Sequence, residues 1–138
     1  MTPWAIVDAG PLVAHLDRRE KHHSWADEWI KRLEPPLLVC EPALTEAMFI
    51  LSGQPAAQDK LMQLLEKGAL KSSFEIGKHA PEIRSLRAKY HDRPMSLADA
   101  CIVRMAELNE KHSVFTLDAD FRIYRKNGRD PIPLIAPE

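Results

Sequence analysis

Short apolar runs alternate along this chain with longer stretches of helical periodicity, and this alternation restricts the fold more than any other feature. The apolar runs predict strands at 4–7, 37–40, 69–76 and 114–117. A last run at 132–135 predicts an edge strand, because Pro131 and Pro133 fit poorly in a central one. Helices are expected from about Pro11, then at 22–33, 42–52, 55–67, 80–90 and 96–111, with a short one from about Phe121. The pattern predicts a three-layer α/β/α fold with a central, mostly parallel sheet of about five strands.

Length, charge and cysteine usage restrict the class of protein. A chain of 138 residues with 45% hydrophobic content fits a single domain, 1–138, with one core. Glu or Pro interrupts each apolar run before it reaches the roughly 18 residues of a membrane span, and no basic region leads into an apolar signal core. We therefore expect a cytoplasmic protein with no membrane partner. Cys40 and Cys101 lack the spacing of a metal site and are expected to be small core residues.

Three aspartates fall where a parallel sheet usually carries its chemistry. Ligands of such sheets gather outside the carboxyl ends of the strands, where the strand order reverses. Asp8 follows the first predicted strand and Asp118 follows the strand at 114–117, so both carboxylates are expected at one rim. Asp99 lies three residues after Ser96, in the first turn of the helix predicted to begin there. We expect the three side chains to lie near one another.

Glu46 stands on the helix at 42–52, whose apolar residues predict burial on nearly every face. A buried carboxylate is costly unless it is paired or bound to a metal, and no basic residue lies within two helical turns of it. The aspartates also have simpler explanations. Asp8 could cap a helix, Asp118 or Asp120 could cap the short helix that follows, and Asp99 could complete a capping box with Ser96.

Taken together, the four carboxylates indicate a cation. Carboxylates a few ångströms apart repel by roughly 4 kcal/mol per pair at an effective dielectric near 20, so a positive charge is needed to hold them together. Oxygen ligands without neighbouring histidine favour Mg²⁺ or Mn²⁺ over zinc. Such an ion, with open positions for water and phosphate oxygens, suits the hydrolysis of phosphodiesters.

Four stretches carry a resemblance to a known family: I-V-D-A-G-P-L-V-A, E-P-A-L-T-E-A, M-S-L-A-D-A and F-T-L-D-A-D-F. In their order and approximate spacing they resemble the PIN-domain ribonucleases, and among these the short VapC-type toxins of toxin-antitoxin pairs. The resemblance covers almost the whole chain. It implies that the catalytic and metal-site residues are Asp8, Glu46, Asp99 and Asp118, with Asp120 as a possible fifth ligand and Thr116 as a hydroxyl that orients a carboxylate. Many relatives carry Ser or Thr two residues after the first Asp, whereas this chain has Gly10.

The resemblance also implies an activity and partners. It implies an endoribonuclease in which Mg²⁺ or Mn²⁺ activates a water that attacks the phosphate, giving 5′-phosphate and 3′-hydroxyl products. A cognate antitoxin protein, an RNA substrate and a homodimer are the implied partners. Basic residues flank two of the acidic motifs and are candidates for binding the RNA backbone: Arg93, Arg122, Arg125, Lys126 and, further on, Arg129.

Other functions stay open at this point. A PIN-like module with weak catalysis, acting by binding RNA or protein, is one alternative, and Gly10 keeps it in consideration. A stand-alone nuclease outside any toxin pair is another. A haloacid-dehalogenase-type phosphatase is disfavoured because Gly10 occupies the place of its second Asp, and a receiver domain because Asp118 stands where it needs Lys. Nothing in the sequence distinguishes transfer, ribosomal or messenger RNA as the target.

Overall fold

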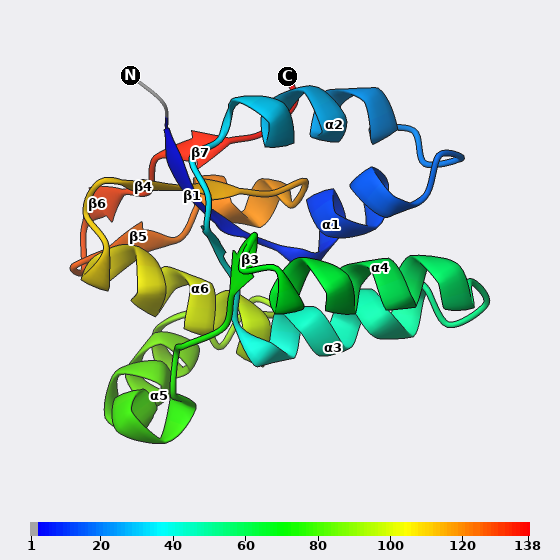
Figure 1. Cartoon of the computed structure of the whole chain (residues 1–138). Helices are drawn as coiled ribbons and strands as arrows, with labels where there is room; N and C mark the ends of the chain where they lie inside the picture. Colours follow the sequence, from blue (N-terminus) through cyan, green and yellow to red (C-terminus); the bar gives the residue numbers. More distant parts are fainter. Residues whose placement is uncertain (1–2) are drawn as a thin grey trace.

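A parallel five-stranded sheet forms the centre of the structure, a computed structural model that describes residues 3–138. Its order is β3-β2-β1-β4-β7 (Figure 1). The strands are β1 (Trp4–Val7), β2 (Leu37–Leu38), β3 (Leu70–Lys71), β4 (His112–Phe115) and β7 (Leu134–Ile135). Helices flank the sheet, so the predicted three-layer α/β/α fold is confirmed.

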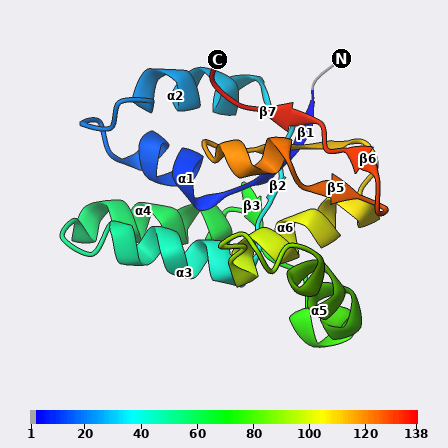
Figure 2. The ribbon, with the colours of Figure 1, turned by 180° about the vertical axis from the view of Figure 1, so that it is seen from behind.

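The helices largely match the predicted segments (Figure 2). They are α1 (Ala9–Leu16), α2 (His23–Arg32), α3 (Glu41–Ile50), α4 (Pro55–Glu66), α5 (Ala80–Lys89) and α6 (Leu97–Leu108), with short 3₁₀ helices at Ile76–His79 and Ala119–Arg122. Helix α1 begins two residues before Pro11 because Asp8 caps it. Within residues 3–138, no helix is both long enough and apolar enough to cross a membrane.

The pairing of β1 with β4 places the core. The two strands run parallel, with Ile6 beside Val114 and Val7 beside Phe115, and all four side chains are fully buried. From β1 the order runs outward through β2 to β3 on one side and through β4 to β7 on the other. The strand order therefore reverses between β1 and β4, and the first residues beyond these strands share one rim of the sheet.

Four strand predictions need correction, since β2 and β7 also form only two residues within the predicted runs at 37–40 and 132–135. The run at 114–117 is only half strand, since β4 ends at Phe115, and Thr116 and Leu117 lead from it toward Asp118. The run at 69–76 forms just two residues of strand. A hairpin of β5 (Arg125–Lys126) and β6 (Asp130–Pro131) was not predicted, and its turn holds Asn127 and Gly128 at positive φ.

The prediction that the helix at 42–52 is buried on nearly every face is wrong. Ala43 and Ala47 are buried in α3, but the Phe49 side chain is 78% exposed and Ile50 is 48% exposed. Helix α3 packs against α1 and α6, and Phe49 and Ile50 lie on the part of its surface that stays exposed. Apolar composition on both faces of this helix therefore did not mean burial on both.

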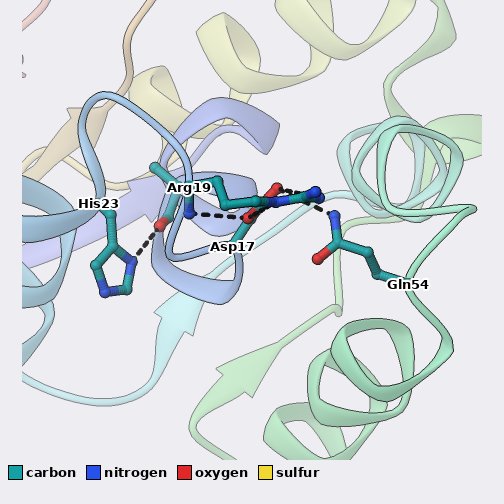
Figure 3. Close-up of polar contacts among 5 residues, drawn as sticks. Asp17, Arg19, His23 and Gln54 are labelled. Atoms are coloured by element: carbon teal, nitrogen blue, oxygen red, sulfur yellow. Dashed lines mark hydrogen bonds and ion pairs between the residues drawn. The ribbon is translucent and has the colours of Figure 1, made fainter.

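The end of α1 is fastened to the loop between α3 and α4 by Asp17 (Figure 3). Its carboxylate accepts hydrogen bonds from the backbone N–H of Arg19 at 3.0 Å, from Arg19 Nε at 3.2 Å and from Gln54 Nε2 at 3.0 Å. His23 Nδ1 donates to the carbonyl oxygen of Ala14 at 2.7 Å and joins α2 to α1. The hydrogen bonds from Arg19 and Gln54 lower the pKa of Asp17 to about 2.

Candidate active site

A cleft of about 440 Å³ opens at the carboxyl ends of β1 and β4. The residues lining it come from the ends of these strands, from α3 and from the start of α6: Asp8, Gly10, Glu46, Pro94, Ser96, Asp99, Leu117 and Asp118. The four acids predicted as the site therefore meet in one place. Asp120, the possible fifth ligand, does not line this cleft, and its Oδ1 lies 4.0 Å from Nη1 of Arg93.

Asp8 is fixed by its position between β1 and α1. Its Oδ1 accepts from the backbone N–H of Ala9 at 2.8 Å, which makes it the N-cap of α1. Its Oδ2 accepts from the hydroxyl of Thr116 at 2.8 Å, and the same hydroxyl oxygen accepts from the backbone N–H of Asp118 at 2.9 Å. Asp8 is therefore both a helix cap and a wall of the cleft, and Thr116 connects it to the segment after β4.

Asp99 is held at the start of α6. Ser96 and Asp99 form a complete capping box, with the Asp99 N–H donating to Ser96 Oγ at 3.0 Å and the Ser96 N–H to Asp99 Oδ2 at 3.3 Å. The hydroxyl of Tyr124 also donates to Oδ2, at 3.1 Å. The capping explanation is thus correct for Asp99, and it coexists with a place in the cleft.

Glu46 and Asp118 form the more open side of the cleft, and both are exposed residues. Asp118 caps the 3₁₀ helix that follows it, since its Oδ1 accepts from the backbone N–H of Asp120 at 2.9 Å. Because Glu46 is exposed, its carboxylate is only partly desolvated, and the full cost of burial on which its selection from the sequence rested does not apply. Its place in the cleft wall is what keeps it in the candidate site.

The cleft carboxylates lack cationic partners. In residues 3–138, none of the Lys, Arg or His side chains forms an ion pair with Asp8, Glu46, Asp99 or Asp118. Asp8 is 8% exposed, and this burial raises its pKa to about 6 from the ordinary 3.8. The hydrogen bonds from Thr116 and Ala9 act in the opposite direction and lower the pKa, whereas the charges of Asp99 and Glu46 raise it further. Burial likewise raises the pKa of Asp99, with a contribution from Asp118. Partial desolvation in the cleft wall, together with the charges of Asp99 and Asp118, raises the pKa of Glu46.

This donor set fits a hard divalent cation. The ligating atoms are carboxylate oxygens, which Mg²⁺ and Mn²⁺ prefer. Among the described residues, no three His, Cys, Asp or Glu side chains already stand in ligating geometry. Mg²⁺ commonly keeps several waters and takes only one or two carboxylates directly, so a preformed cage is not required. The uncompensated negative charge on four acids in one cleft is the feature that favours cation binding.

Gly10 lies against Leu117, and this close approach favours a residue without a side chain at position 10. A Cβ at position 10 would stand 3.2 Å from the Cβ, Cγ and Cδ1 atoms of Leu117, which is tighter than ordinary contact. Leu117 therefore occupies the space beside position 10, where the resemblance described from the sequence leads us to expect a hydroxyl. In this chain the described hydroxyl that reaches Asp8 is that of Thr116.

The predicted RNA-binding residues fall into two groups. Arg93 and Arg122 are exposed beside the cleft-forming segments, and Lys126 is half-buried in β5. Arg125 is engaged elsewhere, because its Nη1 donates to the carbonyl oxygens of Arg122 at 2.7 Å, Tyr124 at 3.1 Å and Ile123 at 3.2 Å. Arg125 thus fastens the turn after the 3₁₀ helix.

Comparison with known proteins identifies the family. Residues 5–127 match the PIN domain family. The chain belongs to the PIN-domain family. Its fold is also similar to the crystal structure of VapC20 from Mycobacterium tuberculosis, described as a sarcin-ricin loop cleaving toxin, with a TM-score of 0.72, 14% identity, and coverage of 84% of this chain and 91% of that one. Comparison with curated protein sequences found no match.

PIN domains are nucleases. Two residues that shape the cleft were not selected from the sequence. Tyr124 lies 25 positions from Asp99, and nothing local signals their contact. Leu117 gave no signal because its role depends on its approach to Gly10.

The raised pKa of Asp8 predicts an unusual dependence of stability on pH in metal-free protein. The folded state disfavours ionised Asp8, so the free energy of unfolding falls as pH rises from about 4 through about 6. A shift of this size corresponds to at most about 3 kcal/mol. Asp8→Asn keeps the cap and removes the charge. We expect this variant to match the wild type near pH 4 and to exceed its free energy of unfolding at pH 8, measured by urea denaturation with a chelator present.

Asp17→Asn is the matched control for that experiment. Its folded pKa of about 2 lies below the ordinary value, so ionised Asp17 stabilises the protein above pH 4 and the contribution is lost as pH falls toward 2. This variant should lose stability at neutral pH. The raised pKa of Asp8 would be contradicted if the free energy of unfolding of the wild type, compared with that of Asp8→Asn, did not decline between pH 4 and pH 8.

Proposed function

We propose that this PIN domain is a Mg²⁺- or Mn²⁺-dependent endoribonuclease that hydrolyses RNA phosphodiester bonds in the cleft between β1, β4 and α6. The observation that carries the proposal is that Asp8 and Asp99, 8% and 7% exposed, face one cleft with Glu46 and Asp118 and pair with no cationic side chain of residues 3–138. Buried carboxylates without counter-charge are costly in a purely structural role. A bound cation would offset that cost.

Asp8, Asp99 and Asp118 would hold the cation directly or through water, and Glu46 would assist from α3. Such an ion, when bound, lowers the pKa of coordinated water and neutralises charge that develops on phosphate oxygens. The protein supplies orientation. Thr116 fixes Asp8 at 2.8 Å, the capping box fixes Asp99, and the first turn of the 3₁₀ helix fixes Asp118. Asp120 is less suited to direct ligation, because it lies outside the cleft and faces Arg93.

The RNA backbone would approach along Arg93, Arg122 and Lys126, whose positive charges would offset the negative potential of the cleft. Arg125 would act indirectly by holding the turn that carries Arg122. Arg93 and Arg122 would thus attract phosphates beside the carboxylates that hold the cation. Lys126 is next to Asn127, whose backbone N–H donates to Glu107 Oε2 in the last turn of α6, so it would bind RNA farther from the cleft.

We further propose a biological setting for this activity. The fold shared with VapC20 supports a toxin of a toxin-antitoxin pair, with an antitoxin protein as partner, a cytoplasmic location, and residues 1–138 acting as one PIN domain. A homodimer is also proposed. The exposed Phe49 and Ile50 on α3 offer it an apolar surface.

Metal-dependent cleavage tests the proposed activity. We expect metal-stripped protein to be inactive on a mixed set of structured and single-stranded RNAs and to regain cleavage when Mg²⁺ or Mn²⁺ is added. Asp8→Asn and Asp99→Asn should lower the cleavage rate by at least about 100-fold, because each removes a ligand charge from the cation. The rate is measured from labelled RNA fragments resolved on denaturing gels.

Asp17→Asn serves as the control, since it neutralises a carboxylate outside the cleft. It should retain the wild-type rate at a temperature where the protein stays folded. Cleavage that survives a chelator, or that Asp8→Asn retains in full, would contradict the proposal. RNA binding without cleavage under any metal would instead support the binding-module alternative.

The salt dependence of RNA affinity tests the basic residues. In an Asp8→Asn background, which prevents cleavage, Arg122→Gln should reduce the slope of log affinity against log salt by about 0.7 if Arg122 contacts one phosphate of a single strand. Arg32→Gln is the control, because Arg32 is exposed in α2 and does not line the cleft. An unchanged slope in Arg122→Gln would remove this residue from the RNA-binding surface.

A further inference from the structure

Tyr124 makes an unusual contact for a residue outside the acidic motifs. Its side chain is fully buried, and its hydroxyl donates to Oδ2 of Asp99 at 3.1 Å. Among the hydrogen bonds of residues 3–138, those that reach the Asp99 carboxylate come from Tyr124 and from the backbone of Ser96, and both fall on Oδ2. Oδ1 is therefore the oxygen of Asp99 left to bind a ligand in the cleft.

The Tyr124 ring is held from several directions, so its hydroxyl has a fixed position. Phe121 packs edge-on against it with ring centroids 5.3 Å apart, and Tyr90 does the same at 5.0 Å. Its backbone N–H donates to the carbonyl oxygen of Asp120 at 3.2 Å. A donor placed this rigidly restricts the rotation of the carboxylate that it contacts.

The same short segment connects two carboxylates of the cleft. Asp118 caps the 3₁₀ helix at Ala119–Arg122, and Tyr124 follows immediately after Ile123, the C-cap residue of that helix. The segment 118–124 therefore positions two carboxylates. The backbone N–H of Asp120 holds the Asp118 side chain, and the Tyr124 hydroxyl holds the Asp99 side chain. Donors that hold a metal ligand from behind commonly contribute ten- to hundred-fold to metal affinity.

We propose that Tyr124 is a positioning residue of the cation site: its hydroxyl orients Asp99 by holding Oδ2, so that Oδ1 is presented to the cation. This inference rests on the proposed function, since it requires that Asp99 bind a divalent ion. Tyr124 itself touches neither cation nor RNA. Its contribution passes entirely through Asp99.

Tyr90 provides a matched control. It is also a buried tyrosine, it packs against Tyr124, and its hydroxyl accepts from the backbone N–H of Arg125 at 2.9 Å. Tyr90→Phe thus removes a buried hydroxyl from the same aromatic cluster without removing a contact to a carboxylate. Its effect on metal binding reports purely structural disturbance.

The experiment is a calorimetric titration of the metal-free wild type, Tyr124→Phe and Tyr90→Phe with Mn²⁺ alone. Circular dichroism checks that each variant is folded. We expect Tyr124→Phe to weaken Mn²⁺ binding roughly ten-fold and Tyr90→Phe to leave it within about two-fold. In RNA cleavage, the Mn²⁺ concentration for half-maximal rate should rise in Tyr124→Phe, and the rate at saturating Mn²⁺ should return close to the wild-type value.

The outcomes separate the inference from the proposal on which it rests. Equal Mn²⁺ affinity in wild type and Tyr124→Phe, or an equal loss in both tyrosine variants, overturns the role of Tyr124 and leaves the cation site intact. A wild type that binds no Mn²⁺ overturns both. Loss confined to Tyr124→Phe supports positioning through Asp99.

Discussion

The parallel pairing of β1 with β4 is the constraint on which the rest of the structure depends. It sets Val7 beside Phe115, so the chain leaves both strands at the same rim, and the Asp8 N–H donates to the carbonyl of Phe115 at 3.0 Å. From that point Asp8 starts α1, and Thr116 reaches back to its carboxylate. The strand order reverses at this pair, which leaves a cleft rather than a covered edge.

Burial raises the pKa of Asp8 and Asp99 in this cleft, and a bound cation would favour the ionised form of both carboxylates. Asp17, outside the cleft, shows the opposite behaviour. Its carboxylate accepts hydrogen bonds from Arg19 and Gln54, and these lower its pKa. Asp8 has hydrogen bonds from Thr116 and Ala9, yet burial outweighs them and raises its pKa to about 6. Under the proposed function, stability and function would conflict at Asp8, as they often do where a protein prepares a site for a charged ligand.

Much of this arrangement could be predicted from the sequence, because it depends on local signals. Strand ends, caps and the alternation of strands with helices predict Asp8, Asp99 and Asp118 at one rim of the sheet. Tyr124 could not be found this way, since its contact with Asp99 depends on how the 3₁₀ helix folds back onto α6. Composition also misjudged α3, where Phe49 is exposed, because a helix's own residues do not reveal which elements cover it.

Anomalous diffraction from crystals soaked in Mn²⁺ tests whether the carboxylates of this cleft bind a divalent cation. We expect an anomalous peak in the cleft within direct-ligand range, about 2.0–2.6 Å, of a carboxylate oxygen of Asp8 or Asp99. The peak should be absent from crystals of Asp8→Asn soaked in the same way. Wild-type crystals with no peak in the cleft, or with Mn²⁺ bound only at other surfaces, would contradict this expectation.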